Sequence, residues 1–364
     1  MRLRCTISML GILIVALCVV ARSTPEPGEE DMDLALRTRI AIDSVAWQPV
    51  SGGWILFGRD EDDEDPVPTS WRIYKVRPDG TGLSPVSPTP LSNPIWAPDG
   101  TKFACVEDTP NDGDGLWVVD IHGNRLYSLG QHPGFLGFAG WSPDGSKIAF
   151  TTRRGDGGPY VAVMTSPGEE LRFLSEGWAT AWHPSGRYVL YWRRSRQDNL
   201  SHLYEVDVET GQSRQVTSGE FNDYWGEYSP DGEWIAFLSS RGLDVPGGSQ
   251  ICLVRRNGSD LRVLTLGDSD ATWEYTPPSF SPDGQYLVFG RGKWVPTDLY
   301  ICRIDGTGLR KLTNFYPDDQ AKANSPLKVV KDPASQGKAS SASKAQPANK
   351  QKQKKSSGVP LSKP

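Results

Sequence analysis

The sequence has few of the residues on which metal sites and nucleophilic active sites usually depend. Only four of its 364 residues are histidines, namely His122, His132, His183 and His202. They are widely spaced, without the paired pattern of zinc hydrolases, and each lies beside a predicted turn or strand end, where we expect a solvated side chain. No Gly-x-Ser-x-Gly motif occurs, and the many Asp-Gly pairs fit hairpin turns better than phosphate-binding loops. The sequence therefore predicts no catalytic residues, no metal and no cofactor.

Calcium is the one metal that the acidic residues could attract, and their spacing argues against it. Asp108, Asn111, Asp112 and Asp114 gather in one loop, but they do not follow the calcium-loop pattern and no bidentate glutamate follows them. We expect this loop to be solvated.

Cysteine is also scarce, with five residues in the chain. Cys5 and Cys18 lie in the N-terminal apolar stretch, so a processed chain would keep only Cys105, Cys252 and Cys302. Three thiols cannot form a disulfide framework. All three fall in apolar strand patterns, which favours buried, unreactive side chains.

No apolar run reaches the roughly 20 residues that a membrane-spanning helix needs. The longest, Ile7–Val20, follows Arg2 and Arg4 and precedes the small residue Ala21, which is typical of an export signal. We predict a signal peptide over 1–21, a linker over 22–36 and a periplasmic or secreted location. An uncleaved N-terminal anchor is the alternative.

The formal net charge of −5 combines an acidic body with a lysine-rich end. The acidic body disfavours nucleic acid as a partner. From Ala321 onward ten lysines accompany a single acid, Asp332, and few apolar residues. Such a composition cannot bury enough apolar surface to fold, so 319–364 is predicted to be a disordered tail. Weak contact of this tail with anionic envelope polymers is a further expectation.

Glycine, proline and aromatic residues are abundant, and they occur in a repeat. The repeat is an aromatic residue followed by a Pro-Asp-Gly-like turn, and its copies start 49, 45, 41, 46 and 52 residues apart. The copies begin at Trp47, Trp96, Trp141, Trp182, Tyr228 and Phe280. This period matches a four-stranded propeller blade. The sequence therefore predicts an all-β fold over 37–318, a six-bladed β-propeller with four antiparallel strands per blade.

Each copy predicts the same β-meander. A tight turn at the glycine leads into a second strand such as Lys147–Phe150, a third strand such as Leu203–Asp207 follows, and a Gly turn precedes a fourth such as Leu261–Thr265. The repeated aromatics are expected to fill the gaps between blades. Two kinds of ring closure remain open: packing of the sixth blade on the first, or an added strand from Arg39–Ile42.

The Ser-Pro-Asp-Gly turn, the Ile-Ala-Phe-like strand and the Leu-Thr ending resemble the repeat of the TolB and dipeptidyl-peptidase propeller families. The resemblance implies a propeller, and it implies function only loosely. TolB proteins carry an additional N-terminal α/β domain, for which only about two dozen residues lie between Ala21 and the first blade.

Alternation of strands separates two faces of such a ring. Short turns lie on one face, while the loops between second and third strands and the connections between blades lie on the other. We call the second the loop-rich face. It is predicted to carry the partner contacts Arg153, Arg193, Arg194, Arg241, Arg291, Trp178, Tyr224, Trp225 and Trp273.

Aromatic rings beside forked guanidinium groups suit a peptide or a carboxylate-bearing partner. We therefore expect a noncatalytic exported propeller that binds a protein or peptide through its loop-rich face. The alternatives are a carbohydrate-binding propeller for acidic sugars and an enzyme resembling the polysaccharide lyases that use a related propeller.

Overall fold

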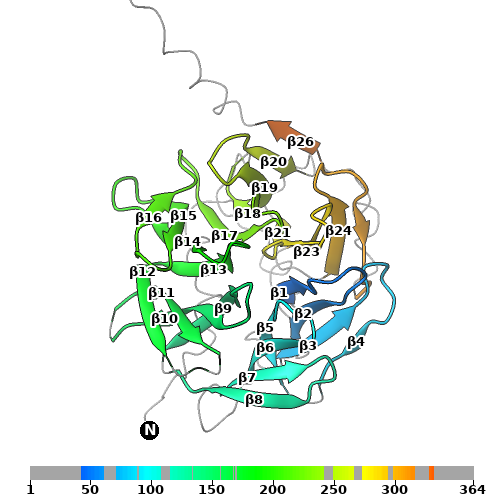
Figure 1. Ribbon diagram of the computed structural model, residues 1–364. Helices are drawn as coiled ribbons and strands as arrows, with labels where there is room; N and C mark the ends of the chain where they lie inside the picture. Colours follow the sequence, from blue (N-terminus) through cyan, green and yellow to red (C-terminus); the bar gives the residue numbers. More distant parts are fainter. Residues whose placement is uncertain are drawn as a thin grey trace, which may run out of the picture.

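Six β-meanders lie in a ring around a central opening (Figure 1). This computed structural model describes residues 42–60, 71–87, 90–107, 115–132, 134–155, 157–166, 168, 170–241, 249–265, 273–293, 298–315 and 328–331. Every regular element in these ranges is a strand, and the described residues include no helix that could cross a membrane. The predicted signal peptide and linker, and the acidic loop at 108–114, lie outside the described residues.

The first three blades use consecutive strands of the chain, ordered from the centre outward. Blade 1 consists of β1 (Ile42–Trp47), β2 (Ile55–Asp60), β3 (Trp71–Val76) and β4 (Ser84–Pro85). Blade 2 consists of β5 (Ser92–Trp96), β6 (Lys102–Glu107), β7 (Gly115–Asp120) and β8 (Arg125–Gly130). Blade 3 consists of β9 (Phe135–Trp141), β10 (Lys147–Arg153), β11 (Pro159–Thr165) and β12 (Leu171–Glu176).

The other three blades follow the same order. Blade 5 has a fifth strand at its outer edge, and the innermost position of blade 6 is shared by two short strands. Blade 4 consists of β13 (Trp178–Trp182), β14 (Tyr188–Arg194), β15 (Ser201–Asp207) and β16 (Ser213–Gln215). Blade 5 consists of β17 (Asp223–Tyr228), β18 (Trp234–Ser239), β19 (Gln250–Arg255), β20 (Arg262–Thr265) and β26 (Lys328–Lys331). Blade 6 consists of β21 (Trp273–Tyr275), β22 (Ser279–Phe280), β23 (Tyr286–Lys293), β24 (Asp298–Arg303) and β25 (Arg310–Lys311).

The predicted fold class and the six four-stranded blades are confirmed. Six apolar clusters hold the ring together, and each joins the facing sheets of two neighbouring blades. Five of the six repeat aromatics are less than a tenth exposed, and the sixth, Trp47, is half-buried. Two of the indoles also donate across a seam: Trp96 Nε1 to the Ala46 carbonyl at 3.2 Å, and Trp141 Nε1 to the Ile95 carbonyl at 3.3 Å.

The ring closes by packing of blade 6 on blade 1. Ile42 pairs with Arg59 inside blade 1, and the described strands of blade 6 all come from 273–311. Apolar residues of both blades share one cluster, which includes Ile42, Phe57 and Leu299. Of the two closures that the sequence allowed, the described residues therefore show the one without an added strand.

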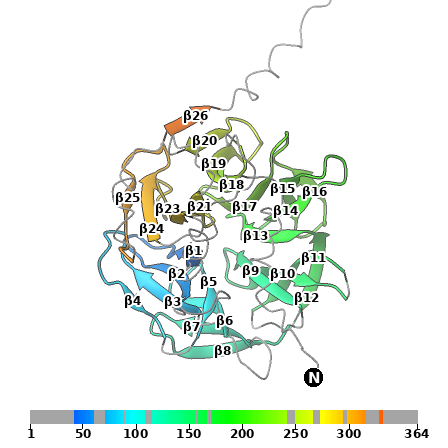
Figure 2. The same cartoon turned by 180° about the vertical axis from the view of Figure 1, so that it is seen from behind.

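One segment departs from the expected disordered tail. Residues 328–331 form β26, which pairs antiparallel with β20 at the rim of blade 5 (Figures 1 and 2). Free N–H and C=O groups on an edge strand favour such pairing even where composition disfavours a packed core. The prediction of disorder is thus wrong for these four residues; the rest of the tail lies outside the described residues.

Candidate binding surface

Four large aromatic side chains gather where blades 4 and 5 meet beside the channel. We call Trp178, Trp192, Tyr224 and Trp225 the mouth cluster. Trp178 stacks on Trp192 with ring centroids 5.7 Å apart and planes 7° apart, and Trp225 lies 6.2 Å from Trp178 and 5.8 Å from Trp192. Tyr224 meets the Trp192 ring edge-on at 5.5 Å. Trp192 is buried while the other three stay half-buried, so the cluster offers aromatic surface on a fixed base.

Strand direction places this cluster on the loop-rich face. Trp178 begins β13 and pairs with Trp192 near the end of β14, and Arg194 pairs with Ser201 across the next loop. The starts of innermost strands and the loops between second and third strands therefore share one face, as the alternation predicts.

A glycine allows Trp178 to approach its partner. Gly177 has φ +134°, and a Cβ there would lie 2.7 Å from the Trp192 carbonyl oxygen and 2.7 Å from the Tyr191 ring. Only a residue without a side chain fits this approach.

Trp225 is held in an unfavourable backbone conformation. Its φ is +54°, within a β-bulge between Tyr224 and Glu227, and a bulky residue rarely adopts this region. The equivalent bulge of β5 carries Asn93 at φ +53°, and asparagine tolerates that conformation better. Backbone strain retained for an aromatic side chain is typical of functional positions.

Three predicted arginines also lie at this face. Arg193 is half-buried, with its guanidinium 4.5 Å from the centroid of the Tyr204 ring. Arg194 is exposed and donates from Nε to the Asn199 carbonyl at 2.8 Å, while the exposed Arg153 ends β10. Arg194 and Arg153 can therefore reach a partner, and Arg193 is partly engaged by its own blade.

Two of the predicted partner contacts are instead buried inside blades. Arg241, 3% exposed, forms an ion pair with Asp223 and donates from Nη2 to the Ser218 carbonyl at 2.8 Å. Arg291, 1% exposed, lies over the Tyr300 ring at 5.3 Å. Burial removes both guanidiniums from the contact surface and makes them supports of blades 5 and 6. For Trp273 the structure describes only the backbone, at the start of β21.

Two histidines also differ from the expected solvated state. His183, 8% exposed, contacts the Tyr228 ring edge-on at 4.8 Å, and burial lowers its pKa. His202, 1% exposed, lies 3.0 Å from the Asp198 carboxylate through Nε2. The described residues contain no group of three or more His, Cys, Asp or Glu that could hold a metal ion.

Cys105, Cys252 and Cys302 are buried, as predicted. Burial raises the pKa of the Cys302 thiol to about 12, so this thiol stays protonated at neutral pH.

Glu227 is a notable polar residue that the sequence did not single out. It lies on innermost strand β17, two residues after Trp225, and its Oε1 accepts from Ser279 Oγ at 3.3 Å and from the Phe280 amide at 3.2 Å. Burial raises the pKa of this carboxyl to about 8 despite these two donors. The signal in the sequence was a lone acid where the other copies carry Ala46, Ile95, Gly140, Ala181 or Ser279.

Fold and surface together define a class: a six-bladed β-propeller with an aromatic patch on its loop-rich face. Residues 169–291 match the family model of the dipeptidyl peptidase IV N-terminal region. An uncharacterized protein of Agrobacterium fabrum is 28% identical over 231 residues, which cover 61% of this chain and 72% of that protein. The TolB structure from Acinetobacter baumannii superposes with a TM-score of 0.55 at 21% identity, covering 74% of this chain and 62% of the other. The chain is thus similar in fold to TolB, and over residues 169–291 it is similar in sequence to the dipeptidyl peptidase IV N-terminal region.

Another relative carries an enzyme name. An uncharacterized peptidase of Bacillus subtilis is 25% identical over 228 residues, which cover 58% of this chain but only 32% of that protein. The chain thus corresponds to about a third of the peptidase, so the match concerns the propeller and leaves the peptidase activity unassigned.

Proposed function

We propose that the chain is an exported, noncatalytic propeller that binds a protein or peptide through the mouth cluster. The observation that supports this proposal is that the half-buried rings of Trp178 and Trp225 pack on buried Trp192, while Trp225 is held at φ +54°. Rigid aromatic anchors with nearby arginines dominate the energetics of protein interfaces. The periplasm is the location we propose, because the N-terminal sequence has the pattern of an export signal and a relative matched over 65 residues is a Tol-Pal system protein TolB.

An unused donor supports the same surface. The indole Nε1 of Trp192 is buried and finds no acceptor among the described residues. A buried N–H without a partner costs free energy, so Trp192 is retained beneath the half-buried rings at some expense of stability.

The test immobilises the full chain and, separately, its Trp225→Asn variant, and compares which envelope proteins each retains. Calorimetry then measures the affinity of each retained protein for the two forms. Asn matches Asn93 at the equivalent bulge, so the ring is removed while the backbone conformation is kept. Losing an anchor of about 2 kcal/mol should weaken binding roughly thirtyfold. Adding Arg194→Ala should weaken it further.

Arg303→Gln, on the opposite face, provides the control, because the Arg303 guanidinium lies over the Tyr286 ring of its own blade. It should leave binding unchanged. Equal retention of every partner by the parent and by Trp225→Asn would refute the mouth cluster as the site. Binding of an acidic oligosaccharide that is lost in Trp225→Asn would instead favour the carbohydrate-binding alternative.

A further inference from the structure

A histidine joins the turns of blades 4 and 5 on the turn face, the face of short turns opposite the mouth cluster. His183 is the one imidazole at its repeat position, where the other copies carry Gln48, Ala97, Ser142, Ser229 and Ser281. At three other seams a Cβ on the turn glycine would meet the proline of the preceding turn at 3.6 to 3.7 Å. Between blades 4 and 5 a Cβ on Gly232 would instead lie 2.6 Å from His183 Nε2, so the imidazole packs against the Gly232 backbone.

The turn of blade 4 uses the neutral form of this imidazole. His183 Nδ1 accepts from the Ser185 amide at 3.0 Å and lies 2.8 Å from the Ser185 hydroxyl. A ring nitrogen that accepts from an amide carries no proton, so the neutral ring keeps its proton on Nε2. A second proton would have to go to Nδ1, where it would face the Ser185 N–H. Protonation of His183 therefore removes a bond that holds the turn.

The surroundings of the ring favour the neutral form as well. His183 meets the Tyr228 ring of blade 5 edge-on at 4.8 Å and the Tyr188 ring of its own blade at 5.9 Å. Burial and the Arg256 guanidinium lower the pKa of His183. Glu205, the Gly232 backbone and Glu233 oppose this effect without reversing it.

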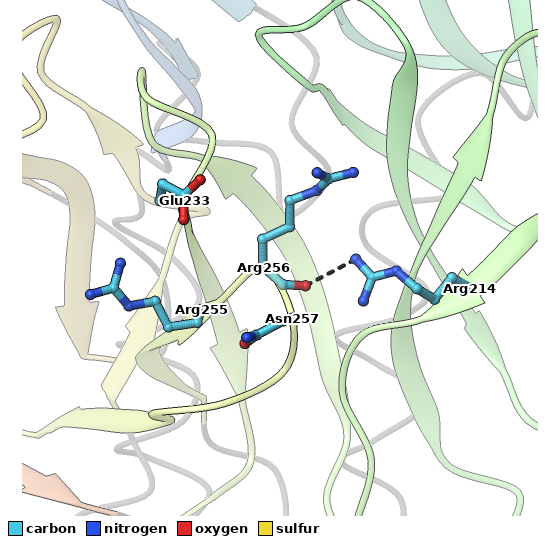
Figure 3. Close-up of a pocket in the computed structure, with 5 residues that line it drawn as sticks. All are labelled: Arg214, Glu233, Arg255, Arg256 and Asn257. Atoms are coloured by element: carbon cyan, nitrogen blue, oxygen red, sulfur yellow. Dashed lines mark hydrogen bonds between the residues drawn. The ribbon is translucent and has the colours of Figure 1, made fainter.

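Glu205, the buried carboxylate at this seam, is already engaged by other donors. It is 2% exposed, and its Oε1 accepts from Arg256 Nε at 2.6 Å and from Tyr228 Oη at 2.6 Å. Its Oε2 pairs with Arg214 of blade 4. Arg214 also donates to the Arg256 carbonyl of blade 5 at 3.0 Å, as the dashed line in Figure 3 shows. Both carboxylate oxygens are thus occupied before an imidazolium could use them.

The strands that meet at His183 also carry the mouth cluster. β13 begins with Trp178 and ends with Trp182, directly before His183. β17 contains Trp225 and ends with Tyr228, which contacts the imidazole. Packed protein interiors transmit displacements, so loosening the two strand ends on the turn face should disturb the aromatic rings at the other ends.

We propose that His183 is a pH-sensitive latch: acidification protonates the imidazole, breaks its bond to the Ser185 amide and loosens the seam between blades 4 and 5. The closed seam favours the neutral ring, so opening should become easier as pH falls below 6.5, the ordinary histidine pKa, and should not change above it. This response of the seam stands without the function proposed for the mouth cluster. Its consequence, weaker partner binding at acidic pH, rests on that function.

The first test gives blade 4 the turn of blade 3, through His183→Ser and Ser185→Asp together. The new carboxylate should stay ionised, as Asp144 does with a pKa of about 2. Hydrogen exchange at pH 7.5 and pH 5.5 yields protection factors, which correct for the intrinsic effect of pH on exchange. Protection of β13 and β17 in the parent should fall threefold to tenfold on acidification, since one group one pH unit below its free pKa shifts an equilibrium by about tenfold at most. In the double variant it should not fall. Glu227 titrates in both proteins and cancels in the comparison.

Strands β5 and β9, at the seam between blades 2 and 3, are the internal reference and should keep their protection. An equal fall in the parent and the double variant, no fall in the parent, or an equal fall in the reference strands would overturn the latch. His183→Asn decides the case if the double variant does not fold, because its carboxamide oxygen can accept from the Ser185 amide but takes up no proton in this range.

The second test concerns binding. Partners retained at pH 7.5 should be released by the parent at pH 5.5 and kept by the double variant. Equal retention by the parent at both pH values would overturn the coupling to the mouth cluster. If neither protein retains a partner at either pH, the function proposed for the mouth cluster fails, while hydrogen exchange still decides the latch.

Discussion

The Ser-Pro-Asp-Gly turn is stable because each of its residues has a separate task. In blade 3 the Ser142 hydroxyl donates to Asp144 at 2.6 Å and accepts from the Lys147 amide at 2.9 Å. Asp144 also accepts from the Ser146 amide, and these donors lower its pKa to about 2. Gly145 supplies φ +70°. The same bonds recur at Ser229–Asp231 and Ser281–Asp283, which explains why the motif repeats.

Replacing the glycine of one such turn should destabilise the fold. Gly232 has φ +74°, and a Cβ there would lie 2.6 Å from His183 Nε2. Gly232→Val should therefore lower stability by about 2 kcal/mol or more, through both strain and collision. Gly211→Val is the control, because Gly211 has φ +72° with no atom within 4 Å of its Cβ position. Thermal melting should show a smaller loss for the control, and equal losses would exclude the collision.

Glu227 should make stability depend on pH. Its folded pKa of about 8 lies above the ordinary value of 4.5, so the folded state retains a proton that the unfolded chain releases. Stability should fall as pH rises from about 4.5 to 8 and then level off. Glu227→Gln removes this slope, so its advantage over the parent should grow to about 2 kcal/mol or more at pH 8. Chemical denaturation at pH 5 and pH 8 measures the difference, and parallel pH curves would contradict the assignment.

Single residues show where sequence reasoning reached its limit. The pattern located Arg241 and Arg291 after second strands, but it could not show that Asp223 and the Tyr300 ring lie beside their guanidiniums. It also placed Trp178 and Trp225 on one face without showing that they share a stack with Trp192. Each of these contacts joins segments that only the packed blades bring together.

Among the elements, the short fourth strands connect neighbouring blades. Arg172 on β12 donates to the Val208 and Glu209 carbonyls of blade 4 at 2.6 and 2.8 Å. Arg214 on β16 makes the same kind of bond to blade 5, and Arg310 on β25 bonds the Pro78 carbonyl of blade 1. An arginine at this strand position therefore ties the outer edge of one blade to the next.

Strand β26 covers the outer edge of blade 5. Four of its residues pair with β20, from Arg262↔Lys331 to Thr265↔Lys328. The only sequence signal was Val329-Val330, a β-branched pair in a segment otherwise rich in lysine, and such a short pair was outweighed by composition.

Truncations on either side of β26 should separate its contribution from that of the remaining tail. Ending the chain after 331 should leave the melting temperature unchanged. Ending it after 325 should remove the paired strand, lower stability by about 1 to 2 kcal/mol and expose an edge that promotes association. Calorimetry and light scattering give the two readouts, and identical behaviour of both truncations would show that the pairing adds nothing in solution.

At the scale of the whole molecule, the repeat count was sufficient to predict the ring because each copy is a complete four-stranded unit. Closure was not predictable, since it depends on whether Ile42 pairs within blade 1 or with blade 6. Five seams of the ring are crossed by the chain itself. The seam between blades 6 and 1 is held by side-chain packing and a few bonds, such as the Trp47 amide to Ser279 Oγ at 3.2 Å.

This difference predicts where the ring opens first. Arg310→Ala and Arg172→Ala remove the same kind of bond, but only the first acts at the seam that no peptide connection crosses. Removing an exposed arginine that makes such a bond should cost about 1 kcal/mol of local stability. This corresponds to roughly fivefold faster exchange of the amide hydrogens that become accessible when the seam opens. Hydrogen exchange should therefore accelerate in β1–β3 and β23–β24 of Arg310→Ala, while Arg172→Ala should leave the protection of β11 and β14 close to that of the parent. Equal acceleration at both seams would mean that the covalent connection does not strengthen the other five, and that the ring opens without a preferred seam.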